Sequence, residues 1–194
     1  LKIMSDRRIN NDQPLSSRKS VLKEADIKLP TRALAATTRE LLYLAESVQT
    51  MFVPAMDIYE NFDKVGVKEL KKIENEIFDV HGRIKNFLAK VSQQNLSEDL
   101  LKRNGDLMMF ADNMAAATDV IVNRLLKLAK ERNEKALVFS DEGWRELLAL
   151  HDRVLVNMQL AMNVLVSSDL ETARQLIIEK NELSSMTRKS LRKH

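Results

Sequence analysis

The sequence predicts an all-α fold, and three observations carry this prediction. Its 194 residues include only 4 glycines and 3 prolines, and aromatic residues make up 5% of the chain. Leucine, alanine, methionine, glutamate and lysine, most of which favour helices, fill much of the remainder. Long stretches space their apolar residues three and four apart, which places them on one helix face. The clustered glycines of phosphate-binding loops are lacking, which excludes P-loop and Rossmann nucleotide enzymes.

Three long helices are predicted in the first part of the chain. The first covers residues 31–63, and Pro54, which lacks a backbone donor, predicts a kink or break inside it. Gly66 separates this helix from the second, at residues 67–93, which is the cleanest amphipathic segment. The third helix is predicted at residues 97–132, beginning with a serine cap and two acids in its first turn.

Two further helices complete the predicted order. Ser140 and the acids after it open the fourth, and residues 167–169 end the fourth and cap the fifth. Three helices followed by two at the same spacing predict a duplicated three-helix unit whose last member is absent. The predicted domains are a tether at residues 1–28, a first unit at 29–138 and an incomplete second unit at 139–194.

The net charge of +3 resides entirely in the predicted tether. Residues 1–28 carry seven basic and four acidic side chains, whereas the remaining body carries 24 of each. A nucleic-acid binder concentrates positive charge on its folded surface, so this neutral body argues against a nucleic-acid partner. The tether is either a plain linker, with at most a short helix near residues 15–25, or a basic segment held near anionic lipid.

Several kinds of site are excluded or disfavoured by the residues present. The chain has no cysteine, which excludes disulfides, zinc-thiolate sites and cysteine nucleophiles. No apolar run reaches the roughly 18 to 20 residues needed to cross a bilayer. His81 and His151 lie beside Asp79 and Asp152, but neither has the glutamate three residues earlier that a di-iron bundle uses, so both are expected to be structural or surface residues. No nucleophile has an adjacent base and an orienting group, so we expect no enzyme.

Lys180 and the methionines interrupt or extend the apolar stripes. Lys180 falls between Ile177 and Leu183, so its aliphatic stem should follow the stripe while its ammonium reaches solvent or an acid. The sequence has nine methionines. Those on the stripes are interpreted as side chains that fill gaps in the core, in preference to side chains that line an adaptable binding groove.

Four short motifs follow one another along the chain. They are LPTRAL at 29–34 with Arg39 and Glu40, HGRIKNFL at 81–88, FSDEGWREL at 139–147, and DLETAR at 169–174 with Lys180. In order and spacing they resemble those of the PhoU-like domain found at the cytoplasmic end of bacterial sodium-dependent phosphate cotransporters. The resemblance covers residues 29–194 and is most specific in the second unit. The proline of the first stretch stands one position short of the family pattern.

The resemblance implies two three-helix bundles joined by a long shared helix, with the sixth helix missing. It also implies that residues 1–28 lead to a transmembrane phosphate-transport domain of the same chain, upstream of Leu1. We therefore expect a non-catalytic regulatory or interaction domain on the cytoplasmic side of the bacterial inner membrane, acting in phosphate uptake or homeostasis. Its expected contacts are that transport domain, anionic lipid and a second copy of the chain.

The resemblance further locates a metal site that this chain has changed. PhoU-like domains hold metal ions with an E-x-x-x-D motif in the third helix and an aspartate in the second. Ala115 replaces that glutamate, and Val122 and Phe78 stand where other acids are usual. The remaining weak ligand candidates are Asp119, Glu40 and Glu46. Because divalent ions want three or more protein ligands, we expect this site to be lost or severely weakened and no cofactor to be held.

These acids also have an interpretation that involves no metal binding. Glu40 and Glu46 fit a solvated helix face better than a former metal site. Asp119 lies close to the apolar stripe, so partial burial is expected, together with either a partner or a raised pKa.

Two other function classes stay open from the sequence. One is a free-standing PhoU-type regulator that docks on a sensor kinase or an ABC transporter, which differs by having no transmembrane segment upstream. The other is a metal-binding bundle, either an enzyme or a metal store. Elemental analysis of the purified protein separates this class from the rest.

Overall fold

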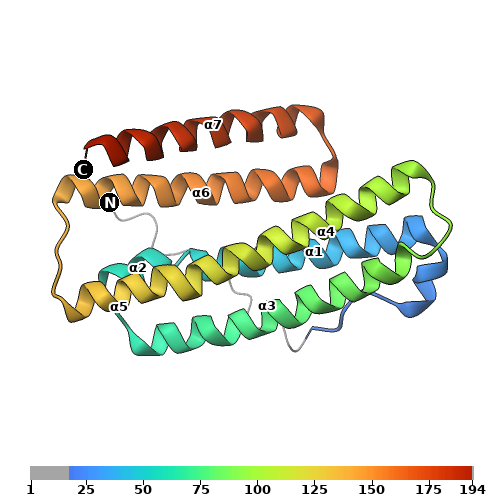
Figure 1. Ribbon diagram of the computed structural model, residues 1–194, viewed down its shortest axis with the longest axis horizontal. Coiled ribbons are helices and arrows are strands. Elements are labelled where there is room, and N and C mark those ends of the chain that lie inside the picture. Colours follow the sequence, from blue (N-terminus) through green and yellow to red (C-terminus); the bar gives the residue numbers. More distant parts are fainter. Residues whose placement is uncertain (1–17, 194) are drawn as a thin grey trace.

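The computed structural model describes residues 18–193, although nothing is described of the Lys193 side chain, and its regular elements are all helices (Figure 1). The all-α prediction is therefore confirmed for this part of the chain. The elements are η2 (Glu24–Lys28), α1 (Pro30–Phe52), α2 (Ala55–Glu60), α3 (Lys64–Val91), α4 (Glu98–Asp119), η3 (Val120–Leu125), α5 (Leu126–Glu134), α6 (Asp141–Ser167) and α7 (Leu170–Lys193).

The core forms where α1, α3 and α4 pack against one another. α1 is central, since it also contacts α6 on its other side, and α7 lies on the far side of α6 (Figure 1). The apolar stripes predicted from the sequence supply this core. Its largest fully buried apolar side chains are Leu41, Leu44, Val48 and Met51 of α1, Ile77, Ile84, Leu88 and Val91 of α3, and Leu107 of α4.

The break predicted at Pro54 is confirmed. α1 ends at Phe52, and the short helix α2 follows from Ala55. Arg132 of α5 closes the other end of α2, where its Nη1 donates to the carbonyl oxygens of Tyr59 at 3.1 Å and Glu60 at 2.7 Å. These bonds satisfy carbonyls that the end of a helix leaves without intrahelical partners.

The start of α3 differs from the prediction that placed a separator at Gly66. Asp63 is the cap, and its carboxylate accepts the backbone N–H groups of Val65 and Gly66 at 2.9 Å each. Gly66 therefore lies in the first helical turn. A Cβ atom there would approach the Ile58 side chain and Asp63 Oδ2 at 3.2 Å, so the glycine permits a close approach to α2.

The third predicted helix is present but not uniform. α4 begins after its Ser97 cap, as predicted, and the helical path runs on to Glu134. Between α4 and α5, η3 is a six-residue π-helical segment that was not predicted from the sequence. It begins with Val120, Ile121 and Val122, whose branched β-carbons lower helix propensity.

α6 and α7 form an antiparallel hairpin (Figure 1). Ser140 caps α6 as predicted, with its Oγ accepting the Gly143 N–H at 3.1 Å. Ser168, in the left-handed conformation at φ 54°, ends α6. Across the hairpin, Arg153 pairs with Glu179 at 3.1 Å and with Glu182.

Part of the predicted tether lies against the bundle. Residues 24–28 form the short helix η2, in which Ile27 is buried and packed into the core. Asp26, also buried, pairs with Arg32 of α1 at 3.0 Å, and Glu24 pairs with Lys90 of α3 at 2.6 Å. Residues 1–17 of the tether lie outside the described residues, and the domain boundaries stay predictions.

Candidate functional site

The predicted metal-ligand candidates are not gathered into one site. Within residues 18–193, no three carboxylate or imidazole side chains cluster closely enough to hold a metal ion. Glu40 is buried on α1, Glu46 is half-buried on the same helix, and Asp119 is exposed at the end of α4. Of the positions where the family carries further acids, Ala115 and Val122 are buried, and Phe78 is 40% exposed.

Glu40 has a structural partner in place of the expected solvated face. Its side chain is 5% exposed, and its Oε2 accepts the backbone N–H of Val21 at 3.1 Å. A hydrogen bond to a carboxylate is stronger than one between neutral groups, which offsets part of the cost of burying this side chain. Glu40 thus fastens residues 18–28 to α1.

The prediction that Asp119 is partly buried is wrong. Its carboxylate is exposed and accepts a hydrogen bond from Asn123 Nδ2 at 2.8 Å. Its charge reaches Glu74 on α3: burial raises the pKa of Glu74, nearby Lys71 lowers it, and Asp119 raises it further. Asp119 therefore faces another acid on α3.

His81 joins α3 to α4 through Asp112. Its Nε2 lies 2.8 Å from Asp112 Oδ1, and Lys85 Nζ lies 2.9 Å from the same oxygen. The hydrogen bonds from Lys85 and His81 hold the pKa of Asp112 below its usual range. The sequence placed His81 beside Asp79, whereas the structure pairs it across helices. Because His81 and Lys85 are four apart, they share one face of α3, which was the available signal.

His151 is a structural residue, as expected. It is 9% exposed, and its Nε2 donates to the carbonyl oxygen of Phe52 at 3.0 Å, where α1 breaks. Its ring lies on the Phe52 ring with centroids 4.5 Å apart, and its Nδ1 lies 3.6 Å from Asp152. This arrangement ties α6 to the end of α1.

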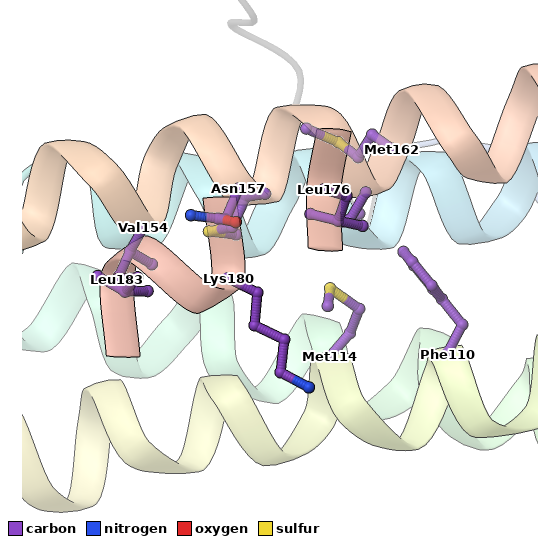
Figure 2. Close-up of a pocket in the computed structure, with 11 residues that line it drawn as sticks. Phe110, Met114, Val154, Asn157, Met162, Leu176, Lys180 and Leu183 are labelled. Carbon is purple, nitrogen blue, oxygen red and sulfur yellow. The ribbon is translucent and has the colours of Figure 1, made fainter. Parts of the chain in front are cut away.

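An apolar groove of about 320 Å³ lies among α1, α4, α6 and α7 (Figure 2). The stem of Lys180 lines it beside apolar side chains, which agrees with the prediction for this residue. Sequence reasoning did not find the groove, because no local pattern reveals that residues of α1, α4, α6 and α7 come together around it. Its lining includes Phe110, Met114, Met158, Met162, Leu176 and Leu183.

None of the helices in residues 18–193 is both long enough and apolar enough to span a membrane. This finding applies to the described helices.

The chain was compared with known proteins. It is 28% identical over 191 residues, 97% of its length, to a Salmonella typhimurium protein named "Putative inorganic phosphate export protein YjbB", of which it covers 35%. It is also 28% identical over 165 residues, 85% of its length, to proteins of the same name from Escherichia coli K12 and Shigella flexneri, covering 30% of each. Its relatives are bacterial proteins named for phosphate export.

The chain spans about a third of the length of these relatives. No family model matches the chain, and no solved structure matches it. The PhoU-like resemblance therefore stays a prediction from the motifs.

Proposed function

We propose that this chain is a non-catalytic regulatory or interaction domain of a bacterial sodium-dependent phosphate transporter. The observation that carries the proposal is the similarity to phosphate-export proteins, which extends over 97% of the chain. Since these relatives are about three times as long, the proposal of one domain in a larger polypeptide is favoured over a free-standing regulator. Their name specifies export, so outward flux is proposed beside the uptake that the motifs suggested.

The PhoU-like assignment is part of this proposal. The FSDEGWREL stretch supports the assignment, because its Ser140 and Gly143 form the cap with which α6 begins. The bundle of α1, α3 and α4, followed by the α6–α7 hairpin, is compatible with one complete and one incomplete three-helix unit.

The proposed mechanism is contact between helices and charge at a surface. The bundle would contact the transport domain and change its transport rate, while the basic residues of the first 28 positions stay close to anionic lipid on the cytoplasmic face. Each cation near such a surface contributes about 1 kcal/mol. A second copy of the chain is a further proposed contact.

A flux experiment on the natural full-length polypeptide tests the proposal. Bacteria lacking their own phosphate transporters would express either that polypeptide or a form that ends before residue 29, and labelled phosphate would be followed in both directions with and without a sodium gradient. We expect sodium-dependent flux to persist in the shortened form but to lose its response to internal phosphate. The two forms must reach the membrane in equal amounts, which immunoblotting of membranes checks.

An unchanged response in the shortened form would contradict the regulatory role. Phosphate flux absent from both forms would contradict the transport assignment. Stoichiometric iron, zinc or manganese in the purified chain would instead support the metal-binding alternative.

A further inference from the structure

Residues 18–28, which we call the latch, lie on the bundle through few apolar contacts. The latch contains η2, which packs against α1 and α3. Ile27 is buried in the core, and Leu22 packs against the core while staying partly exposed. The apolar stripes of α1, α3 and α4, in contrast, each bury several side chains completely. The latch is therefore anchored in the core mainly at two positions.

The two buried carboxylates of residues 18–193 both lie where the latch meets α1. Asp26 of the latch pairs with Arg32 at 3.0 Å, and Glu40 of α1 accepts the backbone N–H of Val21 at 3.1 Å. Taking a carboxylate out of water costs free energy that its partners return only in part. Release of the latch would return Asp26 to water and separate Glu40 from its partner. Burial of these charges thus offsets part of the stabilisation that Ile27 and Leu22 give to the docked latch.

The remaining contacts of the latch lie at the protein surface. Glu24 pairs with Lys90 of α3 at 2.6 Å, and both side chains are exposed. The guanidinium carbon of Arg18, also exposed, lies 3.0 Å from the centre of the Tyr43 ring on α1. Ion pairs and cation–π contacts at exposed positions contribute little to stability. The latch is therefore held less firmly than the helices that it covers.

We propose that the latch opens and closes as one unit on α1 and α3 while the bundle stays folded. Segments that bury few apolar side chains open at a lower free energy than the core. Closed, the latch holds Arg18 beside Tyr43 of α1. Open, its eleven residues form a link that can extend to about 36 Å.

The two states of the latch would give the bundle two distances from the polypeptide that precedes residue 18. The latch is thus a conformational device that changes the length of the connection, in place of a tether of fixed character. The inference depends on the contacts of residues 18–28 and does not require a role in phosphate transport.

Hydrogen exchange of the folded 194-residue chain, followed by mass spectrometry, tests this proposal with a matched pair of variants. Ile27→Val and Ile77→Val remove the same methylene group, one from the latch and one from the fully buried face of α3. Ile77 lies thirteen residues before Lys90, or about 20 Å along α3 from the ion pair with Glu24. Circular dichroism verifies that both variants are folded.

We expect the latch of the unmodified chain to exchange at least about tenfold faster than α1 around Leu41 and Leu44, but more slowly than a free peptide of residues 18–28. Ile27→Val should accelerate exchange of the latch by about two- to tenfold. Ile77→Val should accelerate exchange of α1 by a similar factor and leave the latch unchanged, because Ile77 stays packed when the latch opens.

Low concentrations of urea provide a second test that needs no variant. They should accelerate exchange of α1 more than exchange of the latch, because the effect of urea scales with the surface that each opening exposes.

Three outcomes would overturn the proposal. Equal acceleration of the latch and of α1 by Ile77→Val, or equal sensitivity of the two to urea, would mean that the latch opens only when the bundle unfolds. Exchange of the latch at the rate of the free peptide would mean that the closed state does not form. Since none of these readouts measures phosphate flux, the outcome is independent of the proposed function.

Discussion

At the residue scale, side-chain partners were the least predictable feature. Asp112 illustrates this, because nothing in the sequence separates it from the other acids of its helix, yet it bridges to both His81 and Lys85. Glu40 was assigned to a solvated helix face, because its partner, the backbone of Val21, comes from a segment that was predicted to be a tether. A periodic pattern shows on which face of a helix a residue lies, but not which groups of other elements approach that face.

Asp112→Asn tests the bridge between α3 and α4. The lowered pKa means that folding favours the charged carboxylate, so its contribution is present above the ordinary pKa of 3.8 and is lost as the pH falls through the lower folded-state pKa. We expect the substitution to reduce the free energy of unfolding at pH 7 by about 0.5 kcal/mol, a small value because the pair is partly exposed. Urea denaturation at pH 7 and near pH 3 measures it.

Asp106→Asn is the control for that measurement, because Asp106 is an exposed acid on the same helix. It should change stability less at pH 7. A loss for Asp112→Asn that is equally large near pH 3 would show that the bridge does not act through the charged carboxylate.

At the element scale, local chemistry predicted most of the structure. The serine caps at Ser97 and Ser140, the break at Pro54 and the apolar stripes all correspond to observed features. Two details escaped prediction: Asp63 caps α3 ahead of the expected glycine, and η3 interrupts an otherwise periodic helix. The stripe continues through η3, so periodicity alone did not reveal the wider turn.

Ser140→Ala tests the cap of α6. Removing the Oγ leaves the Gly143 N–H without its acceptor, so we expect the free energy of unfolding to fall by about 1 kcal/mol. The melting temperature and urea midpoint measure the loss. Ser184→Ala, inside α7 with its hydroxyl bonded to its own helix, is the comparison and should not destabilise the protein, because alanine is the better helix former. Equal losses in the two variants would rule out a cap effect.

At the scale of the whole molecule, the helices are unequally supported. α1 is covered by α3, α4 and α6, whereas α7 relies mainly on α6. The sequence predicted a fourth and a fifth helix after the first three, but it did not predict the pairing of α6 with α1. That contact joins residues about one hundred positions apart, as between His151 and Phe52.

Hydrogen exchange followed by mass spectrometry should reveal this inequality. Local opening is easiest where few apolar side chains are buried, so the amides of α7 should exchange first. Those of α1 around Leu41 and Leu44, which are fully buried, should exchange last. Uniform protection across α1 and α7 would mean that the hairpin opens only together with the core.

The π-helical turn of η3 also fixes the rotational phase of α5. A π-helical turn holds one residue more than an α-helical turn, and each residue of an α-helix rotates the chain by about 100°, so winding the same residues as a regular α-helix would rotate α5 by about that amount relative to α4. Arg132 would then point away from the carbonyl oxygens of Tyr59 and Glu60. Deleting one residue within Val120–Leu125 should therefore give a regular α-helix that keeps the contact of Arg132 with α2, whereas deleting one residue from the α-helical part of α5 before Arg132 should break that contact.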